Sequence, residues 1–257
     1  MKVKNSAVAG MFYPENQVQL AQLVSQLLAD NQHLRPESGV HPEVRPKAVI
    51  VPHAGLVYSG AIAALAYNRL RAYTDSIKRV VMMGPSHHVP LNSIASLSAE
   101  QWRTPLGDVQ LDTKYTKELE DTGLVIQNDN AHTQEHCLEV QLPFLQNIGL
   151  DRAVVPLVVG HVDARQVAAV VEYVMGSEET LLVISSDLSH FHPYDEARSI
   201  DADTSCHIER LNPDIKPDQA CGCFAMNGLL LSAKQLGLTV EKLGICNSGD
   251  TAGDKNR

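Results

Sequence analysis

Four short apolar runs without alternating polar positions mark the candidate strands of this chain. They lie at 47–51 (KAVIV), 79–83 (RVVMM), 153–159 (AVVPLVV) and 180–184 (TLLVI). Runs of this kind are typical of strands that are buried on both faces, as in a parallel sheet covered by helices. The pattern therefore predicts four central strands of one covered sheet.

Segments with helical periodicity separate these runs. Residues 15–31 carry apolar side chains close to one helical face, and 163–176 has Asp163 as a candidate N-cap and Gly176 as a stop. Further helical patterns cover 59–72, 134–148 and 221–237. Pro143 would be costly deep inside the second of these, so we expect that helix to begin late. Strands alternating with helices predict a mostly parallel sheet covered on both faces.

The segment 101–112 (QWRTPLGDVQLD) differs from this alternation. Its residues 105–108 form a turn signal between extended flanks, which predicts a hairpin or antiparallel extension of the sheet. The chain has 257 residues, which suits one α/β domain over 1–257.

Composition narrows the class of protein. The net charge of -9 argues against a nucleic-acid-binding surface. No apolar run approaches membrane-spanning length, and the N-terminal residues lack an apolar stretch typical of a signal peptide. We therefore expect a cytoplasmic protein that does not bind membranes. The five cysteines, an odd number without a CxxC pair, argue against a disulfide framework.

Histidines follow the ends of all four candidate strands. In chain order they are His53, then His87 and His88, then His161, then His190 and His192. In open α/β sheets, sites form outside the carboxyl ends of the strands, so these loops should share one edge. A single loop histidine is more often solvated or structural than a ligand. Four such placements predict a functional site at this edge.

The residue types around this edge allow several chemistries. Imidazoles bind borderline transition metals, and a carboxylate or thiolate completes such sites. Cys221 opens a predicted helix, whose N-terminus would lower the pKa of a thiol, although a simply packed cysteine fits equally well. Asp187 shares a loop with His190 and could orient an imidazole or a metal-bound water. A Ser–His–Asp hydrolase using Ser86 or Ser185 competes with this interpretation but lacks a GxSxG motif.

Seven motifs carry a resemblance that spans nearly the whole chain. They are AGMFYP (9–14), VPHAGLVYSG (51–60), GPSHH (84–88), TPLGD (104–108), EHCLEVQLPFL (135–145), SSDLSH (185–190) and GDTAGDK (249–255). In this order they resemble the Memo family, called AmmeMemoRadiSam system protein B in bacteria and archaea. That family is similar in fold to class III extradiol dioxygenases of the protocatechuate 4,5-dioxygenase type. The resemblance implies a three-layer α/β/α sandwich around one central sheet.

The resemblance also implies roles for individual residues. The positions that match the family's metal site are His53, His87 and Cys221. His190 matches the acid–base histidine of the dioxygenases, with Asp187 in the same motif. The EHCLEV motif brings a further histidine toward the pocket, so the expected substrate contacts are His88, His136 and His192. Cys137 stands where the family often has serine.

The third ligand position separates this chain from the extradiol enzymes, which bind iron through two histidines and one glutamate. Here that position is Cys221, a softer ligand that shifts preference toward copper, zinc or thiolate-tolerant iron and argues against ring cleavage. We expect one transition-metal ion, iron or copper ahead of zinc, and a metal-dependent oxidoreductase whose substrate is unknown. Two alternatives stay open: a non-catalytic pocket for a peptide or small anionic ligand, and a zinc hydrolase.

The resemblance also suggests partners. The name of the bacterial system implies a functional association with a radical-SAM protein and an Ammecr-type protein. The related dioxygenases suggest a homodimer. The ligand itself is expected to be a small molecule or a peptide.

Overall fold

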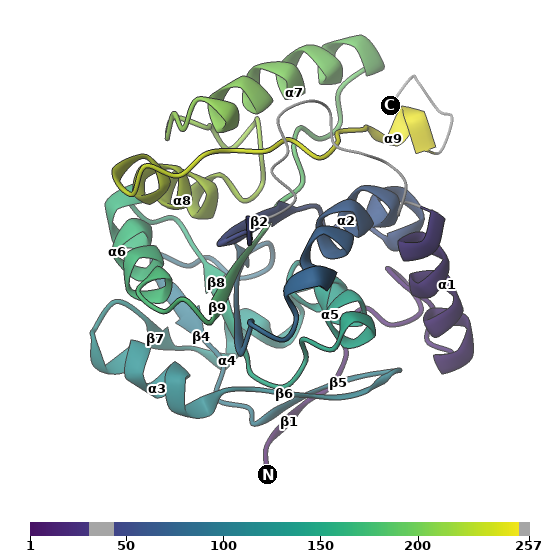
Figure 1. The fold of residues 1–257 in the computed structure, drawn as a ribbon, viewed down its shortest axis with the longest axis vertical. Helices are drawn as coiled ribbons and strands as arrows, with labels where there is room; N and C mark the ends of the chain where they lie inside the picture. Colours follow the sequence, from purple (N-terminus) through teal and green to yellow (C-terminus); the bar gives the residue numbers. More distant parts are fainter. Residues whose placement is uncertain (31–43, 252–257) are drawn as a thin grey trace.

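A six-stranded sheet runs through the centre of the molecule (Figure 1). The computed structural model describes residues 1–30 and 44–251, and in them the strand order is β2–β9–β3–β8–β4–β7. The bounds are β2 (Ala48–Val51), β9 (Thr180–Ser185), β3 (Arg79–Pro85), β8 (Val154–Val159), β4 (Ile94–Ser96) and β7 (Ile126–Gln127). The first four are parallel, and β4 runs antiparallel to β8. The mostly parallel sheet is therefore as predicted, and its antiparallel strand is β4, which lies outside the segment 101–112.

Helices cover both faces of this sheet. Along β3, Val80 and Met82 pack into one hydrophobic cluster while Val81 and Met83 pack into the other. The first cluster lies under α1 (Gln17–Asp30), α2 (Leu56–Leu70) and α5 (Leu142–Ile148), and the second under α3 (Thr113–Asp121), α6 (Ala164–Met175) and α8 (Cys223–Gln235). Each such buried side chain contributes about 1.5–3 kcal/mol. The two clusters explain why the predicted strands lack polar alternation, and they confirm the α/β class.

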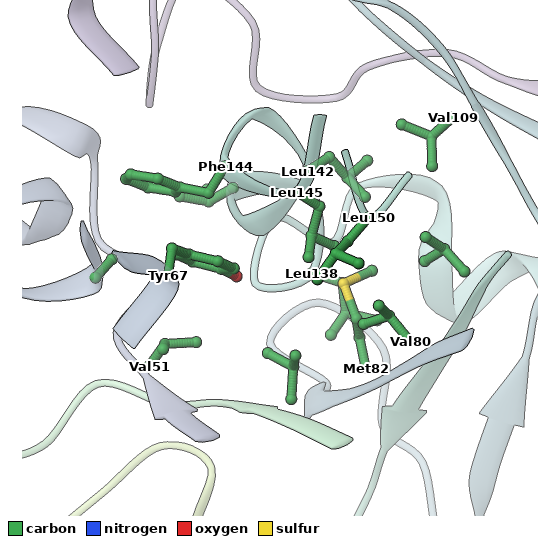
Figure 2. Packing of buried hydrophobic residues seen from close by; sticks show 14 of the residues in the cluster. Val51, Tyr67, Val80, Met82, Val109, Leu138, Leu142, Phe144, Leu145 and Leu150 are labelled. Atoms are coloured by element: carbon green, nitrogen blue, oxygen red, sulfur yellow. The ribbon is translucent and has the colours of Figure 1, made fainter. Parts of the chain in front are cut away.

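The first cluster also holds paired aromatic rings. Tyr67 of α2 and Phe144 of α5 stack with ring centroids 4.8 Å apart and an interplanar angle of 4° (Figure 2). The Tyr67 hydroxyl donates to the Gln141 side chain over 2.8 Å, so this buried phenol is satisfied. The same Gln141 amide reaches the edge of the sheet, where it donates to Ser185. Packing in the first cluster therefore positions the Gln141 side chain, which contacts Ser185 at the end of β9.

Helix boundaries follow local chemistry, and several of them differ by a few residues from the predicted ones. α6 begins after Asp163, whose side chain forms a capping box with Gln166, and it ends at Gly176 as predicted. α5 begins late, after the 3₁₀ turn η2 (Glu139–Gln141), with Pro143 in its first turn. α2 begins at Leu56, earlier than predicted, after an N-cap glycine. α8 begins at Cys223, two residues later than predicted.

A smaller sheet lies at the opposite end of the molecule from α7 (Tyr194–Glu209), as Figure 1 shows. The predicted hairpin is formed by β5 (Gln101–Thr104) and β6 (Gly107–Gln110), and β1 (Val3–Lys4) adds to β5 in parallel. The remaining elements are η1 (Arg71–Tyr73), α4 (Asp129–Thr133) and α9 (Ser248–Thr251). No helix within 1–30 or 44–251 is both long enough and apolar enough to cross a membrane.

A buried carboxylate fastens the N-terminal segment to the body. Glu139 accepts hydrogen bonds from the backbone N–H groups of Ala7 and Val8, over 2.7 and 2.9 Å. It also accepts one from the Tyr13 hydroxyl over 2.7 Å, and its second oxygen lies 3.7 Å from Lys4 Nζ. Because burying a charge is costly without partners, this network fixes the path of the segment. The segment in turn brings Phe12 to the edge of the sheet.

Candidate metal centre

The loops after β2, β3 and β9 meet at the carboxyl edge of the sheet. β9 lies between β2 and β3, so the three loops leave adjacent strands. They carry His53, His87 and Asp187, respectively. The ring centroids of His53 and His87 are 5.3 Å apart, and the rings are nearly perpendicular at 78°. Topology thus brings together two imidazoles that are 34 positions apart in the sequence.

His53 is buried, with 1% of its surface exposed, and neutral groups hold the Nδ1 side of its ring. Its Nδ1 lies 2.9 Å from the Ser185 hydroxyl. Since that hydroxyl donates to the Cys137 carbonyl over 2.6 Å, it accepts a hydrogen bond from Nδ1–H. The other ring nitrogen, Nε2, faces the Cys221 sulfur at 3.4 Å. The hydrogen bonding therefore makes Nε2 the nitrogen available to a ligand.

A carboxylate holds His87. Glu135 Oε1 lies 2.8 Å from His87 Nδ1, and Oε2 accepts the His87 backbone N–H over 2.6 Å. Burial alone would lower the pKa of His87, but its hydrogen bonds with Cys221 and Glu135 raise that pKa to about 10. The His87 side chain is 27% exposed, unlike that of His53. Without a metal ion, the site therefore holds His87 as an imidazolium at neutral pH.

Cys221 lies between the two imidazoles and the loop after β9. Its sulfur accepts the Asp187 backbone N–H over 3.3 Å. Burial would raise the pKa of the thiol, but hydrogen bonds with His53 and His87 lower it to about 6. The helix N-terminus that we expected to lower this pKa begins two residues later, at Cys223. The pKa of Cys221 is lowered, as predicted, but the cause is the two imidazoles and not a helix N-terminus.

A third imidazole joins the site from the segment before η2. The His136 ring stacks on that of His87 at 4.6 Å and lies 5.4 Å from that of His53. Donor atoms of these three histidines lie within 4.8 Å of one another. Burial and the nearby charge of His53 lower the pKa of His136 to about 4, so it stays neutral. His136, expected only as a substrate contact, is thus also placed as a possible ligand.

The remaining predicted residues lie around this centre. His190 Nε2 is 3.8 Å from Asp187 Oδ2, and its side chain is 42% exposed. The exposed His88 ring lies 6.1 Å from that of His136. Within residues 1–30 and 44–251, the one side chain that His192 contacts is Glu196 of α7, over 3.0 Å. The structure therefore places His88 and His190 near the centre and ties His192 to α7.

Comparison with known proteins decides the family. Residues 4–256 match the family model described as Memo-like protein. This chain belongs to the Memo family. It is 35% identical over 268 residues to the MEMO1 family protein of Aquifex aeolicus (strain VF5), covering 99% of this chain and 95% of that one. It is 32% identical over 265 residues to the MEMO1 family protein TV1383 of Thermoplasma volcanium, covering 98% and 94%.

The donor set of this Memo family chain fits a transition-metal ion. Two imidazoles have Nδ1 occupied by hydrogen bonds and Nε2 available, and the nearby thiol has a lowered pKa. Neutral imidazole and thiolate are the ligands that iron, copper and zinc accept. Donor atoms close enough to share an ion lie on His53, His87 and His136, and a second such group is formed by His87, Glu135 and Cys137. The Cys221 sulfur, 3.4 Å from His53 Nε2, adds a further candidate ligand to the first group.

The same geometry weighs against a serine nucleophile. Ser185 is fully buried, and its hydroxyl proton is donated to a backbone carbonyl. The Ser86 hydroxyl donates to the Val89 carbonyl over 2.6 Å. In this Memo family chain, Ser185 therefore supports His53 in place of attacking a substrate.

Proposed function

We propose that this chain binds one transition-metal ion through His53, His87 and Cys221 and acts as a metal-dependent oxidoreductase on a small hydroxyl-bearing ligand. The observation that supports this most is the approach of His53 Nε2 to the Cys221 sulfur, 3.4 Å, with the His87 ring centroid 5.3 Å from that of His53. Iron or copper, when bound, would supply the one-electron redox chemistry that zinc lacks.

Residues at the mouth of the site provide acid–base chemistry. His190, partly exposed and 3.8 Å from the Asp187 carboxylate, would take the proton of a ligand hydroxyl. Asp187 would stabilise the resulting imidazolium while its other oxygen accepts the backbone N–H groups of His53 and Ala54. His136, neutral because its pKa is lowered to about 4, would accept a hydrogen bond from the ligand. His88 and His192 are the further ligand contacts in this proposal.

A second candidate is a pocket that binds a peptide or small anion without turnover. The clustering of the His53, His87 and His136 rings favours it, because imidazole N–H groups can donate hydrogen bonds to an anion. A homodimer and an association with a radical-SAM protein and an Ammecr-type protein stay predictions. Size-exclusion chromatography with light scattering tests the dimer.

Metal analysis tests the first proposal. Protein purified without chelator is compared with His53→Ala, Cys221→Ala and the control Cys206→Ala, which changes a partly buried cysteine of α7. We expect about one ion per chain in the wild type and the control, with little in the other two variants. Negligible metal in all four would contradict the proposal.

Oxygen uptake separates the two candidates. The iron- or copper-loaded protein is assayed with catechols and other phenols, alongside His190→Ala. Turnover that is lost in His190→Ala excludes a pure binding role. Zinc content together with ester or amide hydrolysis would instead indicate the zinc hydrolase.

A further inference from the structure

We propose that Glu135 is the positioning residue of the metal centre, fixing His87 by ring and backbone together so that Nε2 faces the ion. This inference rests on the proposed metal site. Glu135 contacts the proposed metal ligand His87 and is not itself a ligand to the ion. It acts through His87, whose ring and backbone it holds.

Four N–H groups converge on this one carboxylate. Oε2 accepts the backbone N–H of His87 over 2.6 Å, and Oε1 lies 2.8 Å from His87 Nδ1. Oε1 also accepts the backbone N–H groups of His136 and Cys137, over 2.9 and 3.1 Å. A carboxylate has about four lone-pair directions. The four N–H groups, two from the loop after β3 and two from the segment that follows Glu135, therefore use its full capacity to accept hydrogen bonds. Glu135 therefore joins two segments that each contribute an imidazole.

This arrangement restrains His87 at two points. The backbone N–H bond fixes the position of the residue, and the Nδ1 bond fixes the rotation of its ring. A carboxylate that accepts from Nδ1–H also sets the tautomer and makes Nε2 a stronger donor to a metal. The His136 ring, which follows Glu135 directly, stacks on the His87 ring at 4.6 Å and 25°. One residue thereby sets the spacing of two imidazoles.

The surroundings of Glu135 favour this role over a structural ion pair. Its side chain is 1% exposed, and its ion pairs within the described residues are with His87 and His136, at 2.8 and 3.3 Å. No lysine or arginine of those residues forms an ion pair with it. A buried carboxylate requires hydrogen bonds and a nearby cation. Here that cation is an imidazolium or, in the loaded site, the metal ion.

The amide variant Glu135→Gln tests the proposal. Gln removes the charge and turns an NH₂ group toward N–H donors that need an acceptor. We expect affinity for Co²⁺ to fall about 10–100-fold, as for other contacts behind a metal ligand, and the visible Co²⁺ spectrum to change. The control Glu178→Gln alters an exposed glutamate paired with Lys47 and should leave both unchanged.

The variant His87→Ala shows whether Glu135 acts on the metal site through His87 or by stabilising the fold around it. If it acts through His87, the Co²⁺ spectrum of His87→Ala at saturating Co²⁺ should not change further when Glu135→Gln is added. A further spectral change there would overturn the proposal. So would unchanged Co²⁺ affinity in Glu135→Gln when the wild type binds. Failure of the wild type to bind Co²⁺ would instead count against the proposed function.

A wild-type measurement covers the case in which Glu135→Gln does not fold. In the ¹¹³Cd-loaded protein with ¹⁵N-labelled histidine, we expect coupling from cadmium to His87 Nε2 and a retained Nδ1 proton. Coupling to Nδ1 would overturn the proposal, because that nitrogen would then no longer donate to Glu135.

Discussion

His53 and His87, the two histidine arms of the site, are held in place by different contacts. His53 is fully buried, and its Nδ1 donates to the neutral Ser185 hydroxyl, while a carboxylate, Asp187, holds only its backbone. His87 is partly exposed, and the Glu135 carboxylate holds both its backbone and its ring. Packing restrains the first ring, whereas a charge restrains the second. In this site the imidazole near solvent is thus held by a charged partner, and the enclosed one by neutral hydrogen bonds and packing.

The largest expected effect comes from removing either arm. His53→Ala and His87→Ala should each weaken Zn²⁺ binding by at least about 100-fold, beyond the range of contacts behind a ligand. Competition with a chromophoric chelator measures this. A change in only one of the two variants would show that the arms are not equivalent ligands.

The pKa values of Cys221 and His87 predict how metal affinity depends on pH. The pKa of Cys221 is lowered to about 6, so above pH 6 the thiol is mostly ionised, whereas His87, with its pKa raised to about 10, still carries a proton. Metal binding must displace that proton, so affinity should rise at least about tenfold per pH unit from 6 to 8. Below pH 6 the dependence should steepen as Cys221 becomes protonated.

Titration calorimetry in buffers of different ionisation enthalpy counts the released protons. Glu135→Gln should release fewer near pH 7, because the pKa of His87 then falls. Affinity that is independent of pH from 6 to 8 would contradict the assignment of His87 as a ligand.

Ser185→Ala should have a smaller effect than Glu135→Gln. It removes one neutral hydrogen bond to His53, worth about 1 kcal/mol or about fivefold in metal affinity. It also leaves the Gln141 amide and the Cys137 carbonyl each without one buried partner, which should lower the free energy of unfolding by about 1–3 kcal/mol. Chemical denaturation measures the second effect, with the buried Ser232→Ala of α8 as control. If Ser185→Ala weakened metal binding as much as Glu135→Gln does, the neutral partner of His53 would matter as much as the charged partner of His87, contrary to expectation.

His136→Ala gives the smallest expected change in metal affinity. If two imidazoles and the thiolate suffice, the loss should be less than about fivefold, the worth of one neutral hydrogen bond. An effect as large as that of His53→Ala would make His136 a full ligand and the site a four-ligand centre.

The fold was predictable where burial dominates the sequence pattern. Central strands such as β3 and β8 are buried on both sides, so their apolar runs are unbroken. β4 and β7 escaped prediction because they have 3 and 2 residues, too few to show a pattern. α7 escaped because its 16 residues are mostly polar, and its buried positions include Asp201 and Thr204.

The site was predictable only in part. Strand-end placement identified His53 and His87, because topology alone brings those loops together. The roles of Glu135 and Ser185 could not be predicted, because each depends on a partner from a distant segment. Ser185 entered only as a possible nucleophile, and its hydroxyl proved to be buried beneath His53. The cause of the lowered Cys221 pKa was missed for the same reason.

Anomalous diffraction from crystals soaked in iron or copper would locate the ion. We expect one peak bounded by His53 Nε2, His87 Nε2 and the Cys221 sulfur, with Glu135 still hydrogen-bonded to His87 Nδ1. No peak there at saturating metal, or one that persists unchanged in Cys221→Ala, would contradict this expectation.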